Sequence, residues 1–257
     1  MLKRKGKKIY MDFNILDKKL LQNTLFRKSD VVIDTGKETV VADRKNYIGG
    51  SDIPVIMGID KRFETAYGLA RKKAGIDEFT YSSSVFAEYG DLLEPRIRDY
   101  VNSLYGANFT PACLLASNFR ANTDGYDENL NGILEIKTNN GKDDQFKKYE
   151  VQMLFYMICY RKDYGILAQY SRGDDLKGLM FDKSTASGFR EKLPSDFEKP
   201  FDESRMTITY VPYNREKAYN VMKSVWEFLE KVKYVKRGII ESETEWDSFS
   251  VKGEFKI

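Results

Sequence analysis

The sequence contains no histidine in 257 residues, and this absence excludes several kinds of catalytic site. Serine and cysteine hydrolases that depend on a histidine base are ruled out, as are Cys2His2 zinc sites and metal centres built on imidazole. Proton transfer must therefore fall to Asp, Glu, Lys or Tyr side chains, or to a metal-bound water.

Cysteine and long apolar runs are also scarce. The two cysteines, Cys113 and Cys159, cannot supply a four-thiolate metal site within one chain, and we interpret them as small buried hydrophobic residues in a reducing compartment. The longest apolar run, around Val151–Tyr160, is too short to span a bilayer, and the basic N-terminus leads to no apolar signal segment. We therefore expect a cytoplasmic protein that does not enter a membrane.

An excess of charge of one sign is missing as well. Lys and Arg number 42 against 39 Asp and Glu, which gives a net charge of +3. This near-balance argues against a protein that binds nucleic acid by bulk charge alone, but it permits a local basic groove. The 42% hydrophobic content is enough for a sizeable core.

Composition and hydrophobic periodicity divide one large domain into four segments. We expect a Lys-rich N-terminal extension over 1–46, a core over 47–170, a loop insertion over 171–205, and a strand and helix over 206–257. Within the core, the periodicity changes from helical to alternating after Gly106. Helices followed by strands, a helix and further strands predict an α/β fold with a mixed central β-sheet flanked by helices.

Capping residues and apolar spacing predict the individual elements. Pro95 inside a long helix predicts a kink or a junction between two helices, and Thr123-Asp124-Gly125 predicts a tight turn. The expected helices span Ala66–Ala74, Val85–Tyr105, Asp143–Arg161 and Asn214–Lys236, and the expected strands span Cys113–Ala116, Asn118–Asn122, Gly132–Thr138, Tyr164–Tyr170 and Met206–Val211.

The short strand Ile133–Lys137 carries the main chemical signal. Because side chains alternate across a strand, Glu135 and Lys137 share one face. Asp124 lies in the turn before the hairpin that delivers Glu135, so the two carboxylates can meet. With waters and a backbone carbonyl they make a hard oxygen site suited to Mg²⁺ or Mn²⁺, beside an ammonium group that can orient an attacking water. The local spacing fits a surface salt bridge equally well.

Two polar residues on predicted helices are further candidates. Glu94 directly precedes Pro95, where a helix kink can aim its side chain inward; the alternative is a solvated helix edge. Gln152 follows Tyr149 by three residues and precedes Tyr156 by four, so the three share one helix face. The alternative interpretation is a solvent-facing amide between two ordinary packing tyrosines.

These motifs occur in an order that resembles a known family. The YqaJ-type phage recombination exonucleases, the group that includes lambda exonuclease within the PD-(D/E)xK nuclease superfamily, have a similar order. The resemblance runs from about Arg44 to Tyr170, and it implies a restriction-endonuclease-like core. The motifs that carry it are Ile48-Gly49-Gly50-Ser51-Asp52-Ile53, Gly90 with Glu94-Pro95, Thr123-Asp124-Gly125, Glu135-Ile136-Lys137 and the Gln152 helix.

The resemblance implies a metal centre and a catalytic lysine. Asp124 and Glu135 would be the metal-binding carboxylates, with the backbone carbonyl of Ile136 as a further ligand. Lys137 would be the catalytic lysine. The implied cofactor is Mg²⁺, with Mn²⁺ able to substitute for it.

It also implies supporting and DNA-binding roles. Glu94 would support the metal, directly or through a water, and Gln152 would help to hold the nucleophilic water or the lysine. Arg44 and Ser51 have a spacing similar to that of the family residues that line a 5′-phosphate pocket, and Asn122 stands where a phosphate-contacting serine can occur. An arginine and a hydroxyl at a helix N-terminus suit an anion. The alternative for Arg44 is a basic residue without a specific role.

The implied activity is that of a Mg²⁺-dependent double-strand DNA exonuclease, which works 5′-to-3′ and leaves 3′ single-stranded tails for phage-type recombination. The implied partners are double-stranded DNA ends, a single-strand annealing protein and further copies of the chain, with a trimer as the family precedent, in a bacterial or phage-infected cell. Two alternatives stay open: a metal-dependent endonuclease of the same fold, and a non-catalytic DNA-end-binding protein.

Overall fold

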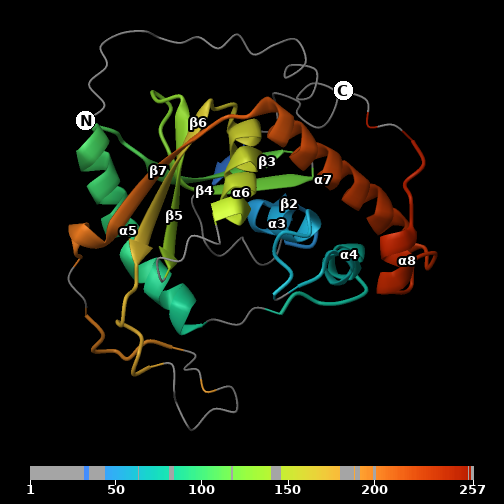
Figure 1. Cartoon of the computed structure of the whole chain (residues 1–257), viewed down its shortest axis with the longest axis horizontal. Coiled ribbons are helices and arrows are strands. Elements are labelled where there is room, and N and C mark those ends of the chain that lie inside the picture. Colours follow the sequence, from blue (N-terminus) through green and yellow to red (C-terminus); the bar gives the residue numbers. More distant parts are fainter. Residues whose placement is uncertain are drawn as a thin grey trace.

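A seven-stranded mixed sheet lies at the centre of the computed structural model (Figure 1). The strand order is β1-β3-β4-β5-β6-β7, and β2 pairs with β4 off this path. The β2–β4 and β5–β6 pairs are parallel, and the other pairs are antiparallel. The strands are β1 (Val32–Asp34), β2 (Ile48–Gly49), β3 (Thr110–Ala116), β4 (Phe119–Tyr126), β5 (Gly132–Asn139), β6 (Tyr164–Ser171) and β7 (Met206–Pro212).

The helices flank this sheet, which confirms the predicted α/β class with a mixed central sheet. They are η1 (Gly50–Asp52), α3 (Ile53–Ile56), α4 (Ala66–Ala74), α5 (Val85–Tyr105), α6 (Phe146–Tyr160), η3 (Glu203–Arg205), α7 (Arg215–Lys236) and α8 (Glu243–Ser248). The structure describes residues 32–34, 44–62, 64–80, 84–116, 118–139, 146–179, 188, 192–198, 201–253 and 255.

Local capping explains why the helices begin and end where they do. The side chains of Thr65, Ser84 and Asn214 each accept a hydrogen bond from a backbone N–H in the first turn of α4, α5 and α7. Gly75 and Gly106 end α4 and α5 in the left-handed conformation, with φ of 78° and 61°. The predicted bounds of α4 and α5 are therefore confirmed.

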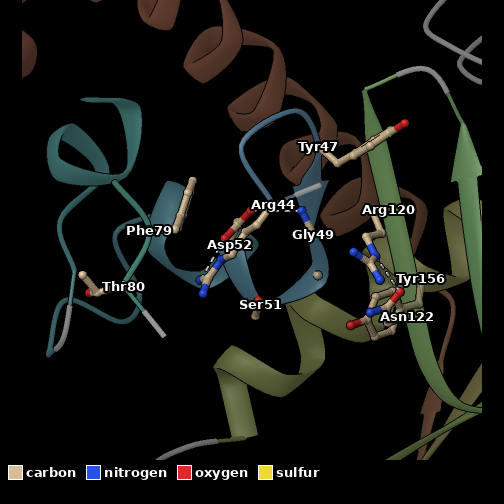
Figure 2. A pocket seen from close by; sticks show the side chains of 11 residues that line it. Arg44, Tyr47, Gly49, Ser51, Asp52, Phe79, Thr80, Arg120, Asn122 and Tyr156 are labelled. Atoms are coloured by element: carbon tan, nitrogen blue, oxygen red, sulfur yellow. Dashed lines mark hydrogen bonds and ion pairs between the residues drawn. The ribbon is translucent and has the colours of Figure 1, made fainter. Parts of the chain in front are cut away.

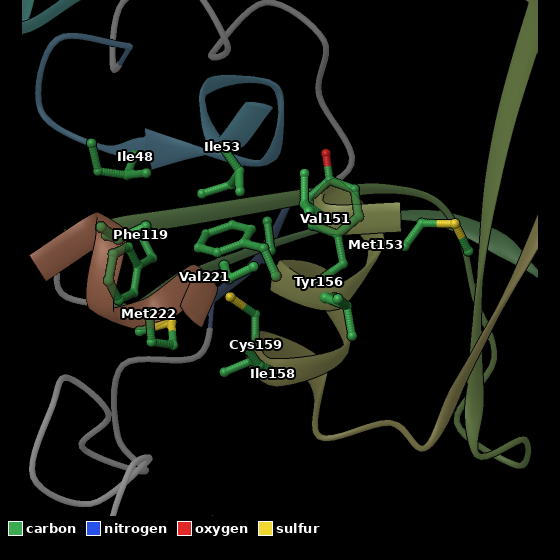
Figure 3. Close-up of a cluster of buried hydrophobic side chains, with 14 of the residues drawn as sticks. Ile48, Ile53, Phe119, Val151, Met153, Tyr156, Ile158, Cys159, Val221 and Met222 are labelled. Carbon is green, nitrogen blue, oxygen red and sulfur yellow. The ribbon is translucent and has the colours of Figure 1, made fainter. Parts of the chain in front are cut away.

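Two hydrophobic clusters fill the two sides of the sheet. One packs α6 between the sheet and helices α3, α4 and α7, and Figure 3 shows Phe119, Tyr156 and Val221 within it. The other lies under α5, on the side of the sheet away from α6. The second half of α6, Val151–Tyr160, is buried all round rather than along one stripe. Both free cysteines are buried, as predicted.

Several predictions at the level of single elements are wrong. Thr123, Asp124 and Gly125 form no turn, because β4 runs on through Tyr126 and pairs with β5 there. Pro95 marks no junction between two helices, because α5 is one continuous helix. The helix α8 was not predicted, although a capping box marks its start. The predicted start of α6 at residues 143–145 lies outside the described residues, as does most of the 1–46 extension.

The described parts of the predicted insertion, 171–205, pack against α5 and β6. Leu176 is buried, and Phe197 and Phe201 contact the cluster under α5. Asp175 accepts hydrogen bonds from the Tyr89 hydroxyl at 2.7 Å and from Arg205 at 2.9 Å. Among the described residues, no helix is both long and apolar enough to cross a membrane.

Candidate active site

The site begins where β4 and β5 separate. Their backbone pairing ends at Gly125 and Leu134, and two side chains take its place beyond that point. The Thr123 hydroxyl donates to the Leu134 carbonyl at 2.8 Å, and the Ile136 N–H donates to Asp124 Oδ2 at 2.7 Å. Side chains rather than backbone groups therefore hold the two strands, and the carboxylate of Asp124 lies beside β5.

Glu135 and Lys137 extend from the same face of β5, as the alternation predicts. The Lys137 ammonium and the Gln152 amide both donate to Glu135 Oε1, the latter at 2.6 Å. The other oxygen, Oε2, is buried and has no hydrogen-bond partner among the described residues. Glu135 is only 1% exposed, so the alternative of a solvated surface salt bridge is wrong. A buried carboxylate oxygen without a donor is costly unless a cation binds it.

The donor set around this oxygen fits a hard divalent cation. Glu135, Asp124 and the backbone carbonyl of Ile136 offer only oxygen ligands, which Mg²⁺ and Mn²⁺ prefer. Within the described residues, no group of three or more His, Cys, Asp or Glu side chains could hold a metal. Two carboxylates, the carbonyl and waters would therefore have to complete the coordination.

Burial and charge perturb the protonation of this pair. Burial, together with the nearby carboxylates of Asp124 and Glu94, raises the pKa of Glu135 to about 8, although Lys137 opposes the shift. Burial lowers the pKa of Lys137, but the carboxylates of Glu135 and Asp124 outweigh it and hold that pKa above its ordinary value. The lysine is therefore an ammonium at neutral pH, and the carboxylate cluster favours a cation.

Helix α5 brings Glu94 to the site through an arginine that the sequence analysis missed. Arg98 Nε donates to the backbone carbonyl of Asp124 at 2.6 Å, and its Nη2 pairs with Glu94. Arg98 thus ties α5 to β4 and fixes the Glu94 carboxylate near Glu135. The spacing of four residues between Glu94 and Arg98 is the signal that could have identified it.

Helix α6 supplies Gln152 and two tyrosines. Gln152 is buried, so the solvent-facing alternative is wrong. Its Nε2 donates to Glu135 and to the Tyr156 hydroxyl, the latter at 3.1 Å. Burial and the nearby Glu135 carboxylate raise the pKa of Tyr156, which keeps its hydroxyl protonated. Lys137 Nζ lies 5.9 Å from the centre of the Tyr149 ring, within the range of a cation–π contact.

Tyr156 also lines a pocket of about 150 Å³ (Figure 2). Arg44, Ser51 and Asn122, which the sequence analysis singled out together, all line it. Arg120 lines it too and was not predicted, although its spacing of two from Asn122 on β4 places both on one side of the strand. Arg120 Nε donates to Asn122 Oδ1 at 3.1 Å.

Asp52, which lines this pocket, belongs to a buried ion pair. Lys73 Nζ lies 2.8 Å from Asp52 Oδ2, and the two side chains are only 4% and 2% exposed. The same ammonium donates to the carbonyls of Arg44 and Tyr47, and Asp52 also accepts from the Gly49 N–H at 3.0 Å. Lys73 offsets the Asp52 charge, so the guanidinium groups of the pocket give it a positive surplus suited to an anion.

Replacing Lys73 by Met should lower the free energy of unfolding by about 3–5 kcal/mol, because it removes the closer cation from a buried aspartate and the donor to two carbonyls. Arg44 Nη2, 3.7 Å from Asp52 Oδ1, is the cation that remains. Urea denaturation followed by circular dichroism measures the change. Lys223→Met is the matched control: that lysine pairs with Glu227 at 3.9 Å, and both side chains are almost half exposed. The control should cost less than about 1 kcal/mol. Equal losses of unfolding free energy in the two variants would contradict the stabilising role of the Asp52–Lys73 ion pair.

Part of the chain matches the model of a known family. Residues 41–162 match the model of a family described as the YqaJ-like viral recombinase domain. This range contains the Asp124 and Glu135 carboxylates, Lys137 and the residues of the pocket. No match was found among curated proteins.

Similar solved structures share the fold. An alkaline exonuclease from Laribacter hongkongensis, LHK-Exo, is 19% identical over 79% of this chain and 97% of its own, with a TM-score of 0.51. Its complex with dAMP has 18% identity over the same shares and a TM-score of 0.50. A phage-related exonuclease from Haemophilus somnus 129PT is 16% identical over 75% of this chain and 96% of its own, with a TM-score of 0.53.

Proposed function

We propose that this protein is a Mg²⁺-dependent double-strand DNA exonuclease, and the match of residues 41–162 to the model of the YqaJ-like viral recombinase domain supports this. It degrades one strand from the 5′ end and leaves a 3′ single-stranded tail for phage-type recombination. The observation that carries this proposal is the buried Glu135 carboxylate beside Asp124 and Lys137, one oxygen of which has no donor among the described residues. An exonuclease needs no base-specific contacts, and we found no motif for base recognition.

Each residue of the site has a role in this proposal. Asp124, Glu135 and the Ile136 carbonyl would hold Mg²⁺, and the bound ion would supply an activated water and positive charge at the scissile phosphate. Lys137 places an ammonium beside the Glu135 carboxylate, where it stabilises negative charge on the phosphate. Gln152 is hydrogen-bonded to Glu135 and orients the water. Mn²⁺ should replace Mg²⁺, since both ions accept oxygen ligands.

The arginine-lined pocket would hold the 5′-phosphate of the DNA end. Arg44 and Arg120 supply charge, and Ser51 and Asn122 supply hydrogen-bond donors. The aromatic ring of Phe79, 4.9 Å from the Arg44 guanidinium, helps to position it. LHK-Exo has been crystallised with dAMP, a nucleoside monophosphate, which supports release of mononucleotides by this chain as well.

The wider setting of the reaction follows from the family relationship. We propose that the protein acts in the cytoplasm of a bacterial or phage-infected cell, as a homo-oligomer such as a trimer, together with a single-strand annealing protein. Glu94, held by Arg98, supports the metal directly or through a water in this proposal.

A linear duplex with 5′ phosphates and the same DNA as a closed circle distinguish the candidate functions. In Mg²⁺, the linear duplex should be degraded and the circle should stay intact, and EDTA should stop the reaction. A nicked circle would identify an endonuclease of the same fold. Binding of both without cleavage in Mg²⁺ or Mn²⁺ would identify a non-catalytic end-binding protein.

A further inference from the structure

Tyr156 belongs to both halves of the site. Its side chain lines the arginine pocket (Figure 2), and its hydroxyl accepts a hydrogen bond from Gln152 Nε2 at 3.1 Å. The same amide nitrogen donates to Glu135 Oε1 at 2.6 Å. Two hydrogen bonds therefore connect the wall of the pocket to the carboxylate that we assign to the metal.

The donor protons in this series of hydrogen bonds can be assigned one by one. The Gln152 amide has two N–H groups, and it gives one to Glu135 and one to the phenol oxygen of Tyr156. The Tyr156 hydroxyl is then left with its own proton to donate. Among the described residues it donates no hydrogen bond, although the side chain is only 4% exposed. A buried O–H donor that lines an anion pocket is satisfied when an acceptor binds in the pocket.

Gly50 allows the tyrosine to reach this position. A Cβ atom at residue 50 would lie 2.3 Å from the Tyr156 ring and 2.4 Å from its hydroxyl oxygen, far inside contact distance. Only glycine leaves the ring room against η1 at the base of the pocket. The close approach places the hydroxyl beside the segment that carries Ser51.

We propose that Tyr156 is a positioning residue that couples the 5′-phosphate in the pocket to hydrolysis at Glu135. The inference rests on the proposed function. When the phenol donates to the terminal phosphate, its oxygen becomes a stronger acceptor for Gln152, because hydrogen bonds in a chain polarise one another. The amide is then locked against Glu135, with its carbonyl oxygen directed to the water. A hydroxyl at the 5′ end lacks the negative charge that orders this series of hydrogen bonds.

The test uses short duplexes with a 5′-phosphate or a 5′-hydroxyl and follows release of the first nucleotide, since each cleavage creates a new end. At saturating enzyme, the wild-type protein should release it about tenfold faster from the phosphorylated end. Tyr156→Phe should reduce this ratio to within about twofold. Its apparent Kd for the phosphorylated duplex in EDTA should change by less than about threefold, because the arginines supply most of the binding.

Tyr160→Phe is the matched control. Tyr160 is a buried tyrosine one turn further along α6, and its hydroxyl donates to the Ala121 carbonyl at 2.8 Å, outside the chain to Glu135. This variant should keep the tenfold ratio. Gly50→Ala provides a second route, since the added methyl displaces the Tyr156 ring and should also abolish the ratio.

Four outcomes would overturn the inference. A ratio that survives in Tyr156→Phe, or one that is lost equally in Tyr160→Phe, would remove the specific role of Tyr156 while the nuclease assignment stands. A wild-type protein that releases the first nucleotide from both ends at the same rate would do the same. If the wild-type protein cleaves neither duplex, the proposed function itself fails, and the inference fails with it.

Discussion

Replacing Lys137 by Gln should reduce the single-turnover rate of DNA hydrolysis by about a thousandfold. The substitution removes the ammonium that neutralises charge next to the scissile phosphate. Gln keeps a hydrogen-bond donor near Glu135 Oε1, and Gln152 still donates to the same oxygen, so the buried carboxylate does not lose every partner. The fold should therefore persist, and thermal denaturation followed by circular dichroism checks this.

Lys162→Gln is the control for this experiment. Lys162 is a buried lysine whose ammonium donates to the carbonyls of Asp127 at 3.1 Å and Leu130 at 2.5 Å, in the loop that joins β4 to β5. The control should lose about 1–3 kcal/mol of stability and keep its hydrolysis rate within about twofold. Full activity in Lys137→Gln would place the catalytic site elsewhere. Equal losses of hydrolysis rate in both variants would mean that the loss comes from impaired folding.

Replacing Asp124 by Asn should weaken Mg²⁺ binding by at least about a hundredfold, because the proposed function makes Asp124 a direct ligand, and losing a group that only hydrogen-bonds to a ligand already costs about 10–100-fold. Isothermal titration calorimetry measures this directly, and hydrolysis should fall in parallel. The Asn carbonyl oxygen can still accept the Ile136 N–H, so the junction of β4 and β5 is preserved.

Asp127→Asn is the control for this prediction. It removes a carboxylate charge that stabilises the fold near the same two strands but lies outside the proposed metal site. Asp127 is buried in the loop directly after β4 and accepts the N–H groups of Asn108 and Asn129, both at 2.8 Å. These hydrogen bonds lower its pKa, so the native state gains stability from the ionised form above the ordinary pKa. The variant should lose stability and bind Mg²⁺ like the wild-type protein. Unchanged affinity in Asp124→Asn would contradict the metal site.

Local rules were enough to predict part of the site. Alternation along a strand is fixed by backbone geometry, so Glu135 and Lys137 had to share a face wherever β5 lay. Capping chemistry fixed α4 and α5 in the same way, through Thr65 and Gly106. The order of the motifs then gave the resemblance to the YqaJ-type exonucleases, and residues 41–162 match the model of the YqaJ-like viral recombinase domain.

The remainder depends on contacts between distant segments. Asp124 was expected in a turn because Asp and Gly favour turns, but pairing with β5 holds its segment in a strand. The hydrogen bonds of Arg98 to Asp124 and of Lys73 to Arg44 join elements that lie 26 and 29 residues apart in the chain. No local pattern encodes such pairs. The link through Tyr156 likewise appears only when α6 packs against Gly50.

The most direct test of the central claim is the order in which a linear duplex with 5′ phosphates loses separate labels at its 5′ and 3′ ends in Mg²⁺. The account predicts that the 5′ label is released first, as mononucleotide, while the complementary strand keeps its full 3′ end as a single-stranded tail. Release of the 3′ label first, or release of both at equal rates, would contradict digestion from the 5′ end.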